Sequence, residues 1–78
     1  MIKIGEFKRK DEVLFTIRQC YGDFFCLINP KLDWSTVSSL ERVLLGDMFE
    51  LIHSCLSVAE MKEKTKYYVN GYHFEWEV

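Results

Sequence analysis

The N-terminal third of the chain shows the period-two alternation of apolar and polar residues that is typical of strands. Residues 13–18 alternate in this way, and the apolar run 24–28 ends at Asn29-Pro30, as a buried strand would. Residues 2–7 predict an earlier strand whose apolar positions change parity near Gly5, which indicates a β-bulge. We expect three successive strands, joined by a turn at 8–11 and by a type II′ turn at Gly22-Asp23.

The middle of the chain has the helical period instead. Apolar residues recur at steps of three and four between residues 37 and 56. Ser38 and Glu41 fit a capping box, with Ser35 as a rival N-cap, and Ser57 with Glu60 predicts that the helix kinks or restarts there. The apolar stripe is broader than one sheet face requires; it comprises Val37, Leu40, Leu44, Leu45, Met48, Phe49, Leu51, Ile52, Cys55 and Leu56.

The last fifteen residues predict a β-hairpin. Asn70-Gly71 favours a two-residue type I′ turn, because both central positions of that turn need a positive φ. In this register Lys66 faces Glu75 and Lys64 faces Glu77, as opposite-charge pairs across the strands. The opposite face of the hairpin is apolar and holds Thr65, Tyr67, Val69, Tyr72, Phe74, Trp76 and Val78.

Together these elements predict one small α+β domain over residues 1–78. Its order is β-β-β-α-β-β, with an antiparallel sheet of about five strands joined by short loops. One long helix, kinked near its end, packs on one face of that sheet.

The charge and the cysteine content limit the classes of function that fit this chain. Ten basic and twelve acidic residues give a net charge of −2, whereas nucleic-acid-binding domains are usually basic. The charged first ten residues predict no secretory signal, and no apolar run approaches the length of a membrane span. An odd number of cysteines, Cys20, Cys26 and Cys55, favours a reducing cytoplasm.

The chain carries no motif typical of an enzyme. His53 and Cys55 are the nearest pair of metal-ligand residue types, but their spacing is not that of a structural zinc site. The four glycines are scattered, so there is no phosphate-binding loop. We therefore expect neither catalysis, nor a metal, nor a cofactor.

These observations favour a protein that binds another protein. The specific hypothesis is a bacterial immunity or inhibitor protein that blocks a basic toxin such as a nuclease, with exposed aromatic residues as anchors and acids that steer a cationic partner. The expected partner-binding residues are Asp33, Trp34, Tyr68, His73, Glu75 and Glu77.

Two alternatives remain from the sequence. One is a nucleic-acid-associated regulator that uses the basic cluster Lys8-Arg9-Lys10. The other is a phage or mobile-element accessory protein that forms a homodimer through its sheet or its helix stripe.

Overall fold

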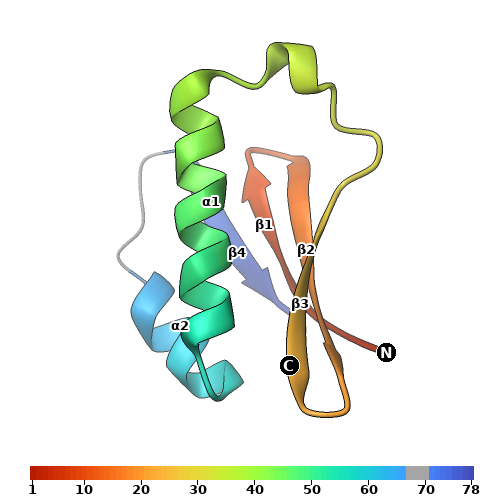
Figure 1. The fold of residues 1–78 in the computed structure, drawn as a ribbon, viewed down its shortest axis with the longest axis vertical. Helices are drawn as coiled ribbons and strands as arrows, with labels where there is room; N and C mark the ends of the chain where they lie inside the picture. The colour runs from red at the N-terminus through yellow and green to blue at the C-terminus, as the bar shows by residue number, and fades with distance from the viewer. Residues whose placement is uncertain (67–70) are drawn as a thin grey trace.

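The computed structural model describes residues 1–66 and 71–78 and contains an antiparallel sheet with two helices (Figure 1). The described strands number four, in the spatial order β3-β2-β1-β4, so the prediction of an α+β class is confirmed and that of about five strands is partly wrong. The elements in chain order are β1 (Ile2–Arg9), β2 (Glu12–Cys20), β3 (Asp23–Ile28), the 3-10 helix η1 (Trp34–Thr36), α1 (Ser39–Ser54), α2 (Val58–Thr65) and β4 (Tyr72–Trp76).

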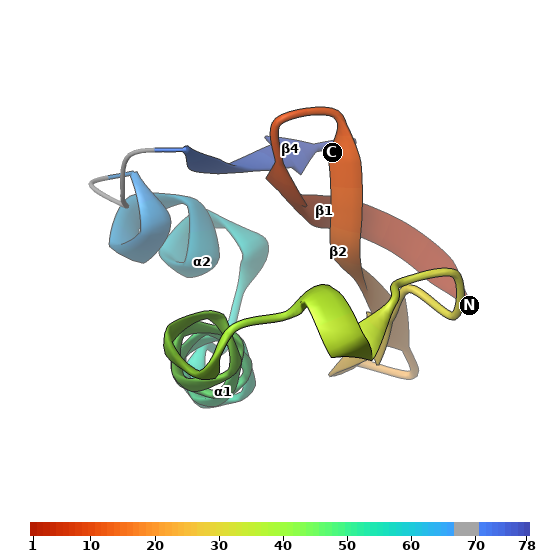
Figure 2. The same cartoon turned by 90° about the horizontal axis from the view of Figure 1, so that it is seen from above.

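Both helices lie on one side of the sheet (Figures 1 and 2). The core between the two layers is closed by apolar side chains from the four strands and from α1 and α2. Phe7 and Phe15 lie at its centre and are fully buried, with ring centroids 5.2 Å apart. The other buried apolar residues are Ile4, Leu14, Ile17, Leu32, Val37, Leu45, Met48, Ile52, Cys55 and Met61.

The capping prediction for the main helix is confirmed. The Ser38 hydroxyl accepts a hydrogen bond from the Glu41 backbone N–H (3.2 Å), and the Glu41 carboxylate accepts one from the Ser38 N–H (3.3 Å). The prediction of one long helix is partly wrong, because two separate helices are present: α1 ends at Ser54, and α2 begins after the N-cap Ser57, where a kink or restart was expected. The apolar stripe is narrower than predicted, because Leu40 and Leu56 are 83% and 92% exposed.

The first half of the predicted C-terminal hairpin is wrong. Thr65 and Lys64 belong to α2, where Lys64 forms an ion pair with Glu60 (3.2 Å) rather than with Glu77. Lys66 is the helical C-cap and pairs with Glu63 (2.8 Å). A helix started at Ser57 satisfies its backbone groups residue by residue, and this gain competes with the predicted pairing of residues 64–69 with the last strand. The hairpin positions Tyr67, Tyr68, Val69 and Asn70 lie outside the described residues.

The second half of that hairpin has the predicted sidedness but a different partner. Tyr72, Phe74 and Trp76 pack against the core, whereas His73 and Glu75 are exposed. β4 pairs antiparallel with β1, with Phe7 opposite Phe74. The first strand of the chain is therefore an interior strand of the sheet.

The register of β1 against β2 contains the predicted irregularity near Gly5. Pairing shifts by one residue between Lys3 and Gly5, and shifts back between Phe7 and Lys8. Each shift places one unpaired residue in a strand, which lets consecutive residues face the core.

Both turns between the first three strands differ from the prediction: the second in position and type, and the first in length. Cys20 pairs with Asp23, so the β2–β3 turn consists of Tyr21 (φ 50°) and Gly22 (φ 86°), as in a type I′ rather than a type II′ turn. The first turn consists of Lys10 and Asp11, because Arg9 still pairs with Glu12.

Candidate functional site

The residues predicted to bind a partner do not form one surface. Asp33 is the N-cap of η1, where its carboxylate accepts a hydrogen bond from the Ser35 N–H (3.0 Å). Trp34 is 42% exposed, and the Arg42 guanidinium lies 5.1 Å from the centre of its ring. In Figure 2, η1 (yellow-green) lies at the same side of the molecule as α1, and β4 lies at the opposite side. His73, Glu75 and Glu77 belong to β4 and the residues after it, and Tyr68 lies outside the described residues.

The acidic residues near β4 are paired with bases. Glu75 lies 3.3 Å from both the Lys8 Nζ and the His73 Nε2, and Glu77 lies 3.6 Å from the Lys3 Nζ. Hydrogen bonds from His73, the larger contribution, and from Lys8 hold the pKa of Glu75 below its ordinary value. This face therefore presents a balanced set of charges rather than an acidic patch.

The basic cluster at the first turn is also largely neutralised. Lys8 pairs with Glu75, and Arg9 pairs with Glu12 (2.5 Å) and with Glu41. Lys10 is exposed at the turn itself. Two of the three charges on which a nucleic-acid interface would depend are already engaged within the chain.

A polar cluster that sequence reasoning missed joins three elements. The Tyr72 hydroxyl donates a hydrogen bond to the Glu41 carboxylate (2.6 Å), and Arg9 donates to the same carboxylate oxygen. The Glu41 side chain is only 13% exposed. Its pKa is lowered by the Tyr72 hydrogen bond first and also by Arg9. The cluster fastens the start of α1 to β1 and β4.

This cluster predicts a pH-dependent contribution to stability. Because the folded-state pKa of Glu41 lies below its ordinary value of 4.5, folding favours the carboxylate. The contribution is present above pH 4.5 and is lost as the pH falls through the folded-state pKa. We expect Glu41→Gln to lower the free energy of unfolding by about 1–3 kcal/mol at neutral pH and by less in acid.

Urea denaturation at neutral pH and at successively lower pH values measures this effect. Glu50→Gln, at an exposed position on the same helix, is the matched control and should leave both stability and its pH dependence nearly unchanged. An equal loss for Glu41→Gln at every pH would show that the carboxylate is not what stabilises the cluster.

The strand β3 combines an unpaired outer side with exposed apolar side chains. It was predicted to be buried, but it lies at an edge of the sheet, where no described strand pairs with its outer side. Phe24, Cys26 and Ile28 face the core, whereas Phe25 and Leu27 lie on the opposite face and are 41% and 47% exposed. After Asp23 the strand has no charged residue and no proline. Edge strands of monomeric proteins usually carry such residues because they block pairing with another chain.

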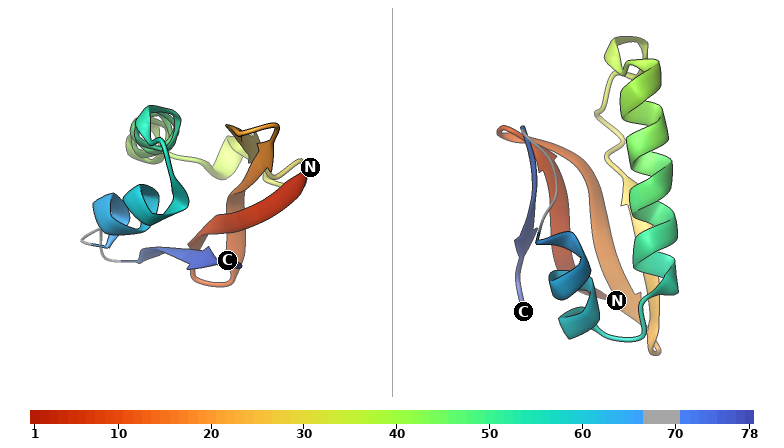
Figure 3. Two further views of the ribbon diagram at one scale, coloured as in Figure 1. Left: turned by 90° about the horizontal axis from the view of Figure 1, so that it is seen from below. Right: turned by 90° about the vertical axis from the view of Figure 1, so that its left-hand side faces the viewer.

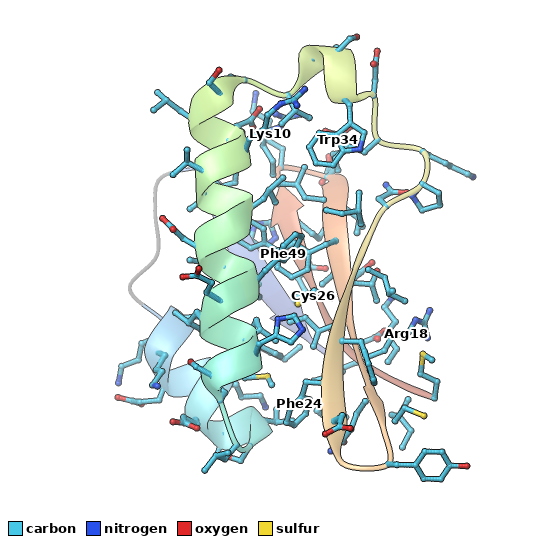
Figure 4. All side chains as sticks on the ribbon, in the orientation of Figure 1. Lys10, Arg18, Phe24, Cys26, Trp34 and Phe49 are labelled. Atoms are coloured by element: carbon cyan, nitrogen blue, oxygen red, sulfur yellow. The ribbon has the colours of Figure 1, made fainter. Side chains whose placement is uncertain are left out.

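A groove lies on the core side of this edge. Figure 4 shows Phe24 and Cys26 between β3 and α1, Phe49 extending from the helix, and Trp34 near its upper end. A hollow of about 380 Å³ opens between the start of β3 and the end of α1; it is lined by Gly22, Asp23, Phe24, Phe25, His53, Cys55 and Leu56. We call β3, with Phe24 to Ile28, the β3 edge.

The cysteines are unpaired thiols with little exposure. Cys20 and Cys26 are half-buried, and Cys55 is buried with its thiol 3.1 Å from the Leu51 carbonyl oxygen. Burial raises the pKa of Cys26 to about 12, which keeps this thiol protonated and unreactive at neutral pH. Cys26 and Cys55 therefore contribute to the packing of the core.

The described residues form neither a metal site nor a membrane-spanning helix, and the chain matches no known protein. Within residues 1–66 and 71–78, no three His, Cys, Asp or Glu side chains are arranged to bind a metal ion. None of the helices in that part of the chain has the length and apolarity needed to cross a membrane. No model of a known protein family matches the chain, and neither a curated protein nor a solved structure does.

Proposed function

We propose that this chain is a non-enzymatic protein-binding domain and that the β3 edge is its binding surface. The observation that carries the proposal is an edge strand that is apolar on both faces and has no blocking charge beyond its first residue. A strand added by a protein partner would pair with its free backbone N–H and C=O groups and would place its own side chains beside Phe25 and Leu27. In this proposal the protein acts in the cytoplasm, as the odd number of cysteines suggests.

The narrower hypothesis of an immunity protein that blocks a basic toxin has less support. It needs free acids beside exposed aromatic residues, whereas Glu75 and Glu77 are paired with lysines and Trp34 lies away from them. The nucleic-acid alternative is weakened in the same way, because Lys8 and Arg9 are engaged by acids. The β3 edge requires neither a cationic partner nor a phosphate.

Affinity capture with a matched pair of variants tests the proposal. Tagged wild-type protein, Leu27→Lys and Leu40→Lys are each exposed to cell lysate supplemented with untagged chain. Leu27 lies on the β3 edge, and Leu40 is an exposed leucine on α1, so the two variants make the same chemical change at different surfaces.

We expect the wild type and Leu40→Lys to retain the same bound protein, and Leu27→Lys to lose it, because a lysine on the strand face would be desolvated by pairing. Circular dichroism confirms that each variant is folded. Identical capture by all three proteins would contradict the assignment of the β3 edge.

A further inference from the structure

We propose that the partner of the β3 edge is a second copy of this chain, paired strand to strand in an antiparallel register centred on Cys26. The inference rests on the proposed function, since it names the occupant of the same surface. It follows from the direction of the backbone groups, the order of the side chains and the charges at the two ends of the strand.

Alternate residues of β3 direct their backbone groups outward. In an antiparallel pair, residues alternate between those bonded to the neighbouring strand and those facing away from it. The two-residue turn makes Cys20 and Asp23 a bonded pair, and the Asn29 N–H, six positions later, donates to the Leu14 carbonyl (3.0 Å). Asp23, Phe25 and Leu27 therefore bond to β2, which leaves the N–H and C=O groups of Phe24, Cys26 and Ile28 for the free edge.

Only one symmetric register uses all three of these residues. A two-fold axis at Cys26 sets Cys26 opposite its own copy and Phe24 opposite Ile28, which allows about six backbone hydrogen bonds. Centring the axis on Phe25 or Leu27 leaves about four, and the next outward position beyond Ile28 is Pro30, which has no N–H to donate.

The same register matches the side chains. On the exposed face, Phe25 of each chain lies opposite Leu27 of the other, and on the core face Phe24 lies opposite Ile28. Every apolar residue of the edge then faces another apolar residue. Phe25 and Leu27, which are 41% and 47% exposed in the single chain, then pack beside each other across the two chains.

The charges at the two ends of the strand are complementary under this symmetry. Asp23 begins β3, and Lys31 follows it just past Asn29-Pro30; both side chains are exposed. Because the copies run antiparallel, Asp23 of one chain lies beside the Lys31 end of the other. Each pair of strand ends therefore brings together opposite charges rather than like ones.

The helix layer of the proposed dimer would place the two α1 helices next to each other. α1 runs along β3 on the core side of the sheet (Figure 3), so a two-fold axis through the edge brings the two α1 helices together. Gly46 lies one turn after Arg42, which contacts Trp34, and one turn before Phe49, which packs on Phe15 of β2. A Cβ at Gly46 would have no atom within 4 Å, so no described contact within the chain calls for glycine there. A glycine is disfavoured inside a helix, but it permits the close approach of a second helix.

Sedimentation velocity with a charge-swap pair tests both the dimer and its register. We expect the wild type to form a reversible dimer with a Kd of micromolar order, since the interface is small. Phe25→Lys and Leu27→Glu should each raise the Kd by at least about tenfold, because each sets a charge against an apolar side chain. Leu40→Glu, on the exposed part of α1, should leave the Kd unchanged, and circular dichroism checks that every variant is folded.

The double variant Phe25→Lys/Leu27→Glu reports the register. In the register centred on Cys26, the introduced lysine of each chain faces the introduced glutamate of the other, so dimer formation should recover from both single variants. A double variant no better than the single ones would overturn this register. A wild type that stays monomeric at high concentration would overturn the self-pairing.

These failures are separable from failure of the proposed function. If the wild type is monomeric and Leu27→Lys still loses a protein captured from lysate, then the β3 edge binds a different protein. If Leu27→Lys changes neither the sedimentation nor the capture, both proposals fail.

Discussion

Replacement of Phe7 by alanine is expected to lower the free energy of unfolding by about 3–5 kcal/mol. Phe7 is fully buried in an interior strand, with the rings of Phe15, Tyr72 and Phe74 centred 5.2, 5.8 and 4.6 Å from its own. Phe7 and its neighbours belong to β1, β2 and β4. The substitution would leave a cavity between these paired strands, which cannot move together to fill it.

Urea denaturation of the monomer, at low protein concentration, measures this loss. Phe25→Ala is the matched control, because Phe25 is 41% exposed on the other face of the sheet. It should cost no more than about 1 kcal/mol. A loss for Phe7→Ala as small as that of the control would mean that Phe7 is not at the centre of a packed core.

Replacement of Gly5 by alanine is expected to cost about 2–3 kcal/mol, because the added Cβ has no space. It would lie 2.7 Å from the Glu75 carbonyl oxygen and 2.9 Å from the Trp76 Cε3. The carbonyl belongs to the backbone of β4, which is already paired with β1, so relief requires the strand to shift.

Gly46→Ala is the control for this prediction. No atom lies within 4 Å of a Cβ at that position, so alanine should stabilise the helix of the monomer by up to about 1 kcal/mol. Thermal or urea unfolding of the two variants should therefore change stability in opposite directions. The same sign for both would contradict the close approach of β4 to Gly5.

Several features of the fold could be predicted from short stretches of sequence. Ser38 and Glu41 form their capping box, Ser57 starts a second helix, and the parity change at Gly5 corresponds to a shift in pairing. The alternation in residues 72–76 also identifies the side of β4 that meets the core. Each of these features depends on hydrogen bonds or burial within a few neighbouring residues, so the local order of residue types is sufficient to determine it.

Features in which two local structures compete, or which depend on distant segments, could not be predicted in this way. The Asn70-Gly71 signal suggested a strand over residues 64–69, but α2 extends through Thr65 because its backbone bonds form locally as the helix grows. β4 pairs with β1, and Tyr72 bonds to Glu41 across 31 positions, with no sequence signal for either contact. Likewise, the apolar run of β3 has the composition of a buried strand, and only the order of strands in the sheet leaves it at an edge. Strand order is set by which faces pack together once the whole chain is folded, and the candidate binding surface is a consequence of that packing.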